Sequence, residues 1–506
     1  MDAGLLLPQP DLLGDRRLVV VSHRQPYAHV RHGKSAAVQV EKPPSGLTLA
    51  IEPIVVATHG TWIAASGGNA DAEFTDARGY VRDPPPDSPY RLRRLTLPPS
   101  LREDFYTGFA NSSLWPLCHI AYHQPRFEEK WWRAYQAVNE IFAQAVAEEI
   151  GGEPATVFIQ DFHLALAPQM VRARCPRALI AQFWHIPWPN PEAFRICPWR
   201  RELLEGMLGN DLLGFHLSYH GMNFMETLDR ELAVRIDREH NLVSRPGAAG
   251  GLTKIGAFPI SVDAQAIIAS VTTSAAQQSV RELRERYARG RQLVLTVERM
   301  DYSKGIRERL EAIQRLFERH PQWRDRVSFV QIATPSRTDV RAYRDYAAGV
   351  DHLVAEINRR WGVRDWKPVL PLHQYVEPRQ VWNWYLAADA LIVSSLHDGM
   401  NLVAKEFAAA ARDDAVLLLS EYTGAAREFR EAVLLNPYAI DDFADKIAAG
   451  LEMPLEQRRE RLRRLRWRVL QYDIGAWAAD ILRALRQHYF DNHGSAFPEN
   501  SGGGMA

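Results

Sequence analysis

Two stretches in the second half of the chain carry side chains suited to binding a nucleotide and a sugar. The first, residues 398–406, reads DGMNLVAKE and follows the apolar run 389–395, which has the composition of a buried parallel strand. Gly399 allows a tight turn, and the helix that starts after it presents free N–H groups to oxygen atoms. Asp398 on the loop can hold sugar hydroxyls, and Glu406, about one turn into the helix, can accept two hydroxyls of a ribose.

The second stretch, residues 298–305 (ERMDYSKG), directly follows another predicted strand. It places two cations, Arg299 and Lys304, beside a glycine turn, which is the arrangement that a departing diphosphate requires. Arg337 follows the next predicted strand and adds a third phosphate-binding cation. Together these residues predict a site for a nucleotide sugar at the carboxyl ends of parallel strands.

The first half of the chain has polar side chains at the same kind of position. Arg24 follows the strand 17–22, Asp161 follows the strand 156–160, and His185 follows the strand 178–183. An arginine fork can grip a phosphate, whereas a carboxylate and an imidazole can bond to sugar hydroxyls. Tyr106 lies in a segment that mixes aromatic and small polar residues, as sugar surfaces do, and Gly46 precedes a helix-like stretch whose N–H groups can reach a diphosphate.

The elements that must position these groups are strands and helices in alternation. The pattern predicts an α/β fold of two Rossmann-like domains facing across a cleft. We expect residues 1–262 to form the first domain, 263–472 the second and 473–490 a last helix, with a disordered tail at 491–506. Residues 71–99 are polar and proline-rich and predict a surface loop or an edge hairpin. The further strands are expected at 60–64, 211–215, 292–297, 327–333, 369–372, 389–395, 415–420 and 432–435.

Composition narrows the class of protein. The chain has 506 residues, 61 basic and 61 acidic, so it carries no net charge that would favour a nucleic acid or an anionic membrane as partner. Its three cysteines are far apart, form no metal-binding spacing and are typical of a reducing compartment. No run has the length of a membrane span, and we expect a cytoplasmic protein. The sequence leaves the oligomeric state open, a homo-oligomer included.

Eight motifs in order give the chain a family resemblance over residues 17–472. They are HRQPY, FANSSLWP, QDFHLALAP, FWHIPWP, NDLLGFH, ERMDYSKG, ATPSRTDV and DGMNLVAKE. With them the chain resembles the trehalose-6-phosphate synthases, retaining glycosyltransferases of the two-Rossmann GT-B architecture. The resemblance implies that residues 1–262 are the acceptor domain and 263–472 the donor domain, and that the C-terminal helix 473–490 crosses back to the first domain. The resemblance implies transfer of glucose from UDP-glucose, or another nucleotide-glucose, to glucose 6-phosphate. It implies no cofactor and no metal, because the two cations of ERMDYSKG take the place of a metal.

The resemblance also implies roles for individual residues. Arg299 and Lys304 would hold the donor's diphosphate, Asp398 the transferred glucose and Glu406 the ribose, while His185 would lie against the transferred sugar. The rest of the donor site would be lined by Gly46, Gly399, Met400, Asn401, Leu402 and Val403. The acceptor sugar phosphate would be held by Arg24, Tyr106, Asp161 and Arg337, with the two arginines and the tyrosine on its phosphate.

Three positions depart from the family pattern. Ser45 stands where the family has the first of two glycines, Ala65 where it often has a second tryptophan, and His23 where it has asparagine. HRQPY is also similar to the related glucosylglycerol-phosphate synthases, so glycerol 3-phosphate is an alternative acceptor. A non-catalytic relative that binds sugar phosphate is the other alternative. Arg337 in PSRTDV matches the sugar-phosphate pattern and favours glucose 6-phosphate.

Overall fold

A computed structural model describes residues 13–33, 37–42, 46–86, 88–121, 123–245 and 251–493. The predicted loop at 43–45 and the predicted tail beyond 493 lie outside these residues. Within them the chain forms two compact units. The N-terminal unit comprises residues 13–118, 124–259 and 475–493, and the C-terminal unit comprises residues 119–121, 123 and 260–474.

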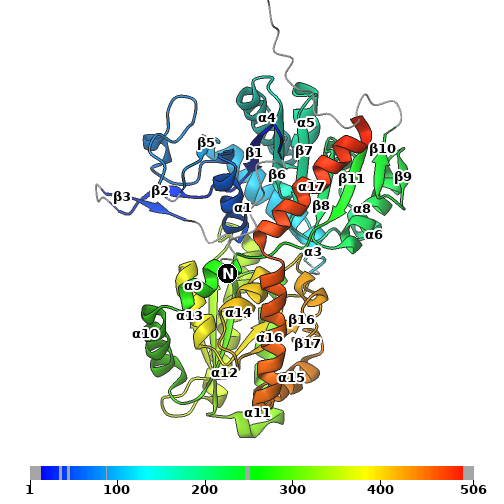
Figure 1. Cartoon of the computed structure of the whole chain (residues 1–506). Helices are drawn as coiled ribbons and strands as arrows, with labels where there is room; N and C mark the ends of the chain where they lie inside the picture. The colour runs from blue at the N-terminus through cyan, green and yellow to red at the C-terminus, as the bar shows by residue number, and fades with distance from the viewer. Residues whose placement is uncertain are drawn as a thin grey trace, which may run out of the picture. The chain divides into compact units, whose positions relative to one another are not determined.

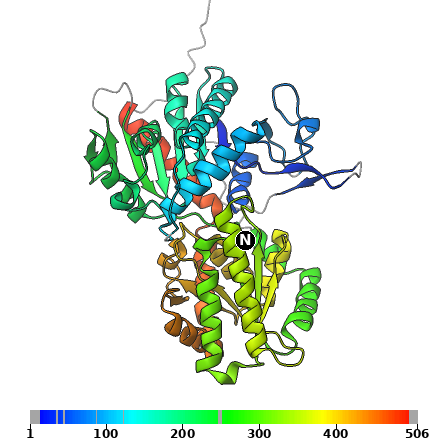
Figure 2. The ribbon, with the colours of Figure 1, turned by 180° about the vertical axis from the view of Figure 1, so that it is seen from behind.

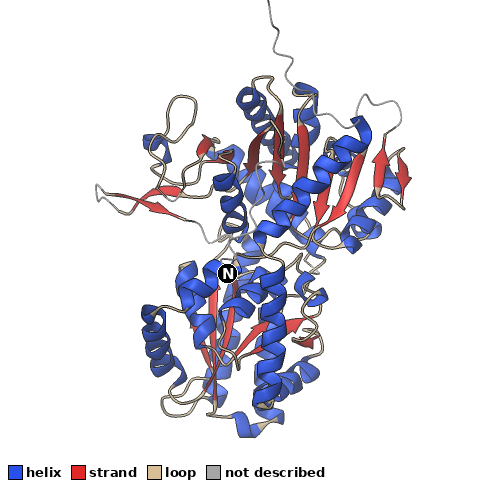
Figure 3. Ribbon diagram, in the orientation of Figure 1, coloured by secondary structure: helices blue, strands red, loops and turns tan. Residues whose placement is uncertain are grey.

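The N-terminal unit is built on a sheet of nine strands in the order β5-β4-β1-β6-β7-β8-β11-β10-β9. Strands are drawn in red in Figure 3. The strands from β5 to β11 are parallel, and β10 and β9 continue the sheet antiparallel. Their bounds are β1 Arg17–Ser22, β4 Thr61–Ala65, β5 Arg91–Leu95, β6 Ala155–Gln160, β7 Leu179–Trp184, β8 Leu212–Phe215, β9 Arg235–Asp237, β10 Leu242–Ser244 and β11 Thr253–Ala257. The central strands are buried over their whole length, as strands covered by helices on both faces are.

Helices join these strands in the alternation expected of a Rossmann-like sheet. They are α1 Gly46–Ala57, α2 Pro99–Arg102, α3 Trp115–His119, α4 Glu129–Ile150, α5 Ala167–Arg174, α6 Pro191–Phe194, α7 Arg200–Met207 and α8 Ser218–Glu231, with short turns η2 Asp71–Phe74 and η4 Phe162–Leu164. The long helix α4 ends at Gly151, whose left-handed backbone (φ 60°) terminates it.

One prediction for the N-terminal unit was wrong, and one element was missed. Residues 71–99 hold a parallel edge strand, β5, rather than only a loop or hairpin, and Arg94 of this strand is buried because it pairs with Asp71. A hairpin of β2 Ala28–Arg31 and β3 Val38–Glu41 was not expected and projects from the unit (Figure 1). The segment around Tyr106 is a π-helix, η3, which spans Glu103–Leu114.

The C-terminal unit has a parallel sheet of six strands in the order β14-β13-β12-β15-β16-β17. Their bounds are β12 Gln292–Arg299, β13 Val327–Thr334, β14 Val369–Leu372, β15 Ala390–Val393, β16 Val416–Ser420 and β17 Val433–Leu435. The helices are α9 Ala264–Val271, α10 Ser274–Leu283, α11 Ile306–Arg319, α12 Arg341–Trp361, α13 Pro378–Ala387, α14 Leu402–Ala410, α15 Ile440–Glu452 and α16 Leu455–Gln471, with short turns η5 Arg284–Ala288, η6 Tyr302–Lys304, η7 Pro321–Trp323 and η8 Gly424–Arg427.

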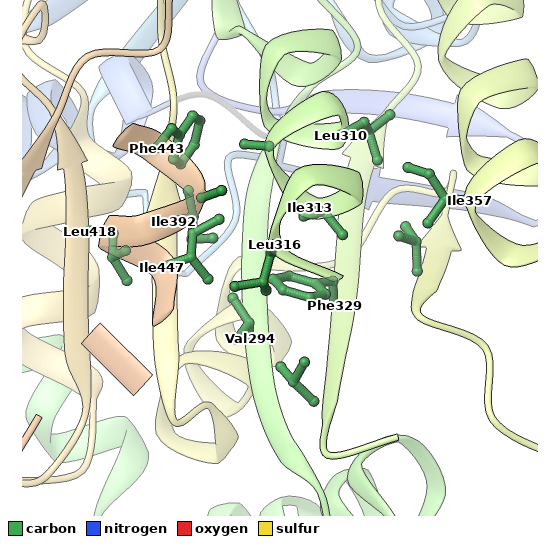
Figure 4. Close-up of a cluster of buried hydrophobic side chains, with 14 of the residues drawn as sticks. Val294, Leu310, Ile313, Leu316, Phe329, Ile357, Ile392, Leu418, Phe443 and Ile447 are labelled. Atoms are coloured by element: carbon green, nitrogen blue, oxygen red, sulfur yellow. The ribbon is translucent and has the colours of Figure 1, made fainter. Parts of the chain in front are cut away.

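Apolar side chains of α11, α12 and α15 form one core with the sheet of the C-terminal unit (Figure 4). Leu310 and Ile313 of α11, Ile357 of α12 and Phe443 of α15 are each no more than 1% exposed. These three helices lie on one side of the sheet, seen from behind in Figure 2. Burial of such side chains contributes about 1.5–3 kcal/mol each and makes this sheet a rigid support for the loops at its carboxyl edge.

The last helix, α17 Ile474–His493, packs in the N-terminal unit (Figure 1). The indole of Trp477 is fully buried there, contacts Phe183 and donates from Nε1 to the carbonyl of Phe258. The α/β class with two Rossmann-like sheets and a C-terminal helix that returns to the first half is confirmed. Among the described helices, none is long and apolar enough to cross a membrane.

Candidate functional site

A cluster of cations lies at the carboxyl ends of β12 and β13 in the C-terminal unit. Arg299 is the last residue of β12, not a loop residue as the sequence predicted, and pairs in register with Thr334. The carboxylate of Asp301, two residues later, lies 3.5 Å from Nη2 of Arg299 and 3.1 Å from Nη1 of Arg337. The two arginines predicted at neighbouring strand ends therefore both lie against one carboxylate. The sequence placed Asp301 in the motif but predicted no role for it.

Asp301 has no solvent-exposed side-chain surface. Burial alone would raise its pKa, but the positive charges of Arg337, Arg299 and Lys304 outweigh burial and hold the pKa of Asp301 at about 2. The hydroxyl of Tyr343 contacts both Arg337 and Asp301 and completes the support of the guanidinium. The carboxylate is thus an anion at every physiological pH.

Lys304 lies at the end of the short turn η6 and points to Asp398. Its Nζ is 2.6 Å from Oδ2 of Asp398, and both side chains are mostly buried, at 12% and 14% exposed. Ser395 and Asn401 donate further hydrogen bonds to the same carboxylate oxygen. Burial opposes ionisation of Asp398, yet Lys304, the charge of His119 and the hydrogen bond from Asn401 lower its pKa well below the usual range. The residue predicted to hold sugar hydroxyls is therefore a permanent hydrogen-bond acceptor.

The loop 398–401 is shaped differently from the prediction. Its left-handed backbone lies at Asn401 (φ 78°), whereas Gly399 does not have a positive φ. Asn401 caps α14 by accepting from the N–H of Ala404. The N–H groups of Leu402 and Val403, in the first turn of the helix, have no partner within the helix. The tight turn predicted at Gly399 is thus made by Asn401, whose left-handed backbone turns its side chain back to the helix.

A neighbouring segment holds this loop in place. The N–H of Gly424 donates to the carbonyl of Asp398, and the N–H of Ala425 donates to the carbonyl of Met400. A Cβ at Gly424 would lie 2.1 Å from the carbonyl oxygen of Gly399, so a side chain there would displace the loop. Sequence reasoning missed Gly424, although TGAAREF after a strand is a recognisable turn signal.

Glu406 lies further along α14, at the position predicted for ribose binding. The hydroxyl of Tyr385 donates to its Oε2 at 3.1 Å. Burial raises the pKa of Glu406 to about 7, against a lesser effect of Tyr385 that lowers it. A carboxyl with this pKa changes charge near neutral pH, which is common at binding sites.

In the N-terminal unit, Arg24 and Tyr106 come together as the sequence predicted. Nη2 of Arg24 donates to the Tyr106 hydroxyl at 3.1 Å. The rings of His23, Tyr106 and His163 pack against one another, with centroids 4.8 Å (His23 to Tyr106), 5.2 Å (His23 to His163) and 5.7 Å (Tyr106 to His163) apart. Burial lowers the pKa of His23 well below its ordinary value, so the ring is neutral and packs as an aromatic group.

Asp161 and His185 form the other part of this cluster. Asp161 has a strained backbone (φ 72°, ψ 174°), a conformation that glycine adopts far more readily, and its Oδ1 accepts from the N–H groups of Phe162 and His185. Burial lowers the pKa of His185 to about 4, so its imidazole is neutral and lies 2.9 Å from Oε1 of Gln160. Burial opposes ionisation of Asp161, but His163 and His185 hold its pKa at about 2.

Each unit thus assembles its own set of predicted side chains. The structure brings together Arg24, Tyr106, Asp161 and His185 in one unit and Arg299, Lys304, Arg337 and Asp398 in the other. Gly46 is the first residue of α1, and Ser45 lies outside the described residues. Ala65 is buried at the end of β4, where its N–H donates to the carbonyl of His23. Within the described ranges, no group of three or more His, Cys, Asp or Glu side chains is placed to hold a metal ion.

The sequence and the fold match a known class of enzyme. The sequence profile of glycosyltransferase family 20 matches residues 16–487, and the chain belongs to that family. The trehalose-6-phosphate synthase of Mycobacterium sp. (strain KMS) is 38% identical over 477 residues, which cover 93% of this chain and 95% of the relative. That of Mycobacterium leprae (strain TN) is 36% identical over 487 residues, covering 94% and 95%. The resemblance drawn from the motifs is confirmed.

Solved structures agree with the sequence relatives. An α,α-trehalose-phosphate synthase (UDP-forming) from Burkholderia xenovorans in complex with glucose-6-phosphate superposes with a TM-score of 0.82 at 29% identity, covering 93% of this chain and all of the other. A trehalose-6-phosphate protein from E. coli bound with UDP-2-fluoro glucose gives a TM-score of 0.81 at 29% identity, covering 93% and 99%.

Proposed function

We infer that this chain transfers glucose from UDP-glucose to glucose 6-phosphate, giving trehalose 6-phosphate and UDP with retention of the α configuration. The observation that carries the inference is the cation cluster of Arg299, Lys304 and Arg337 at two adjacent strand ends, beside the ionised Asp398. Relatives at 36–38% identity are named trehalose-6-phosphate synthase, and similar solved structures hold glucose 6-phosphate or a UDP-glucose analogue. The chain is a glycosyltransferase.

We propose that Arg299 and Lys304 bind the diphosphate of the donor. Negative charge grows on the diphosphate as the bond to glucose breaks, and two fixed cations stabilise that charge more strongly in the transition state than in the ground state. These cations would supply the charge that a divalent metal supplies in other transferases. Lys304 is paired with Asp398 in the structure, so a bound diphosphate would share this cation.

The remaining donor groups are assigned by the family resemblance and by their local geometry. Asp398 accepts hydrogen bonds from glucose hydroxyls and Glu406 from the ribose. The backbone of Gly46 and of Gly399, Met400, Asn401, Leu402 and Val403 lines the donor. The roles of Gly399 to Val403 are supported by the capped start of α14, where N–H groups of the first turn are free of helical partners.

The acceptor groups are proposed in the same way. Arg24, Tyr106 and Arg337 bind the phosphate of glucose 6-phosphate, and Asp161 binds its hydroxyls. The Arg24–Tyr106 hydrogen bond supports a shared role for these two side chains. His185, neutral because of its pKa of about 4, donates from Nε2 to Oε1 of Gln160, and it would lie against the transferred glucose with Nδ1 as a hydrogen-bond acceptor.

The proposed reaction needs no nucleophile from the protein. The acceptor hydroxyl attacks on the face from which the diphosphate leaves, its proton passes to a leaving phosphate oxygen, and the bond from the anomeric carbon to the diphosphate breaks. Catalysis then consists of positioning the two substrates and stabilising charge on the leaving group.

The test is to mix the purified chain with UDP-glucose and one acceptor and to measure UDP release. We expect release with glucose 6-phosphate, and a product whose proton NMR spectrum shows two α anomeric protons. Release with glycerol 3-phosphate alone would assign the alternative acceptor. Binding of UDP-glucose without release in either mixture would identify a non-catalytic relative and refute the inference.

A further inference from the structure

Asp301 stands at the centre of the cation cluster, and nothing in its family resemblance gives it a role. It is fully buried and has hydrogen-bond or ion-pair contacts on both carboxylate oxygens. A buried carboxylate destabilises the folded protein unless ion pairs and hydrogen bonds compensate for its removal from water. The contacts of Asp301 show which groups provide this compensation.

The two oxygens of Asp301 have different partners. Oδ1 accepts from the N–H and the hydroxyl of Ser303, at 3.0 and 2.9 Å, and so fixes the turn η6 that carries Lys304. Oδ2 faces the two arginines, 3.1 Å from Nη1 of Arg337 and 3.5 Å from Nη2 of Arg299. One carboxylate therefore fixes the turn that carries Lys304 and holds both guanidinium groups in place.

Charge alone and geometry alone predict opposite effects for this carboxylate. The cations Arg299, Lys304 and Arg337 face the anions Asp301 and Asp398, so neutralising Asp301 would make the cluster more positive. By charge alone, phosphate groups would then bind more tightly. If the carboxylate instead holds the arginines in place, its loss lets them repel one another and weakens phosphate binding.

We propose that Asp301 is a positioning residue that sets the geometry of two phosphate sites at once. Through Arg299 it orients the cation for the donor's diphosphate, and through Arg337 it orients the cation for the acceptor's phosphate. This inference rests on the proposed function, since it uses the roles assigned to the two arginines. The side chain of Arg337 is only 5% exposed, so its fork has little freedom once Asp301 and Tyr343 hold it.

The experiment compares three variants in steady-state kinetics with both substrates varied. Asp301→Asn keeps an oxygen that can accept from Ser303 but removes the charge, and it should raise KM for UDP-glucose and for glucose 6-phosphate about tenfold or more each. Tyr343→Phe removes only the hydroxyl beside Arg337 and should raise KM for glucose 6-phosphate about threefold to tenfold, with KM for UDP-glucose unchanged. Asp441→Asn is the matched control, because Asp441 pairs with Arg315 on an exposed face of the same unit, and both constants should stay as in the wild type.

Two results would overturn the proposal. One is a folded Asp301→Asn protein whose KM values are unchanged or lower, as charge alone predicts. The other is a Tyr343→Phe protein with an unchanged KM for glucose 6-phosphate, and this variant decides the matter if Asp301→Asn does not fold. Circular dichroism and thermal unfolding establish the fold of each protein.

Binding of UDP alone separates this inference from the proposed function. Calorimetry with UDP should show about tenfold weaker binding to Asp301→Asn than to the wild type or Asp441→Asn. If the wild type forms no trehalose 6-phosphate, the proposed function fails, while a tenfold difference in UDP affinity would still support positioning through Arg299. Equal UDP affinity in an active, folded Asp301→Asn protein would refute the positioning role and leave the function intact.

Discussion

The pair of Lys304 and Asp398 allows a quantitative test of the donor site. Lys304→Met removes the ammonium group and keeps a flexible side chain of similar reach. In the wild type Nζ lies 2.6 Å from Oδ2 of Asp398, and both side chains are mostly buried. The substitution therefore leaves a buried carboxylate without its main counter-charge.

The expected loss of stability follows from what remains around Asp398. Breaking a fully buried ion pair costs about 3–5 kcal/mol. Ser395 and Asn401 still donate to the carboxylate, at 3.1 and 3.2 Å, so the loss should lie near the value of one charged hydrogen bond, about 1.5–3 kcal/mol. Turnover should fall about 10²–10³-fold, because a cation that stabilises the leaving diphosphate is gone.

Urea unfolding and UDP release measure the two effects separately. Lys446→Met is the control, since Lys446 forms an exposed i,i+4 pair with Asp442, and it should shift stability by no more than about 0.5 kcal/mol and leave turnover unchanged. The low pKa of Asp398 means that the pair's stabilisation is present above the ordinary pKa of 3.8 and is lost as the pH falls through the folded value. The difference between wild type and Lys304→Met should therefore shrink in acid.

A Lys304→Met protein that unfolds and turns over like Lys446→Met would refute this reasoning. A double-mutant cycle with Asp398→Asn gives the sharper result, because it isolates the coupling between the two side chains. We expect a coupling of about 1.5–3 kcal/mol in the free energy of unfolding. A coupling near zero would show that the contact in the structure does not stabilise the protein.

Three further predictions concern other parts of the site. Arg337→Ala should raise KM for glucose 6-phosphate about 10–100-fold and leave KM for UDP-glucose unchanged, and the opposite pattern in initial-rate kinetics would contradict the assignment. The pKa of Glu406 is raised from 4.5 to about 7. Its contribution to the free energy of unfolding is therefore fully present below pH 4.5, where the carboxyl is protonated, and is lost as the pH rises through 7. Glu406→Gln should remove that loss, seen as urea midpoints at pH 4.5 and 7.5 that differ less than in the wild type; an unchanged difference would argue against the raised pKa. Gly424→Ala should destabilise the protein by about 1–3 kcal/mol and lower turnover, because its Cβ would meet a backbone oxygen at 2.1 Å. Gly349→Ala on α12 has open space and should instead stabilise by about 0.5–1 kcal/mol, and equal thermal shifts of the two alanine variants would contradict the clash.

The strands that the sequence predicted well are those with continuous apolar runs. Residues 17–22 match β1 at both ends, because a buried parallel strand needs little help from distant residues. Residues 369–372 match β14 at both ends as well, although β14 is an edge strand in which only Val369 is buried. The edge strand β5 reads RLRRL and was missed, since its burial depends on the contact between Arg94 and Asp71, which are far apart in the sequence. A charged residue can be predicted to lie in the core only when its partner is known.

The candidate site was predictable in its parts but not in its connections. Strand ends indicated where Arg299 and Asp398 would lie, since the carboxyl ends of parallel strands share one edge of a sheet. The pairing of the arginines through Asp301 was not visible, because one carboxylate in a run of polar residues gives no sign of its partners. The turn at Asn401 was assigned to Gly399 for a similar reason: a glycine permits a left-handed backbone but does not require one.

The return of α17 to the N-terminal unit has a consequence for how the protein is made. During synthesis residues 260–474 of the C-terminal unit leave the ribosome before residues 475–493 do. The position that Trp477 fills against Phe183 therefore stays empty until residues 475–493 have been made. The core of the N-terminal unit is therefore completed only after the C-terminal unit has been synthesised.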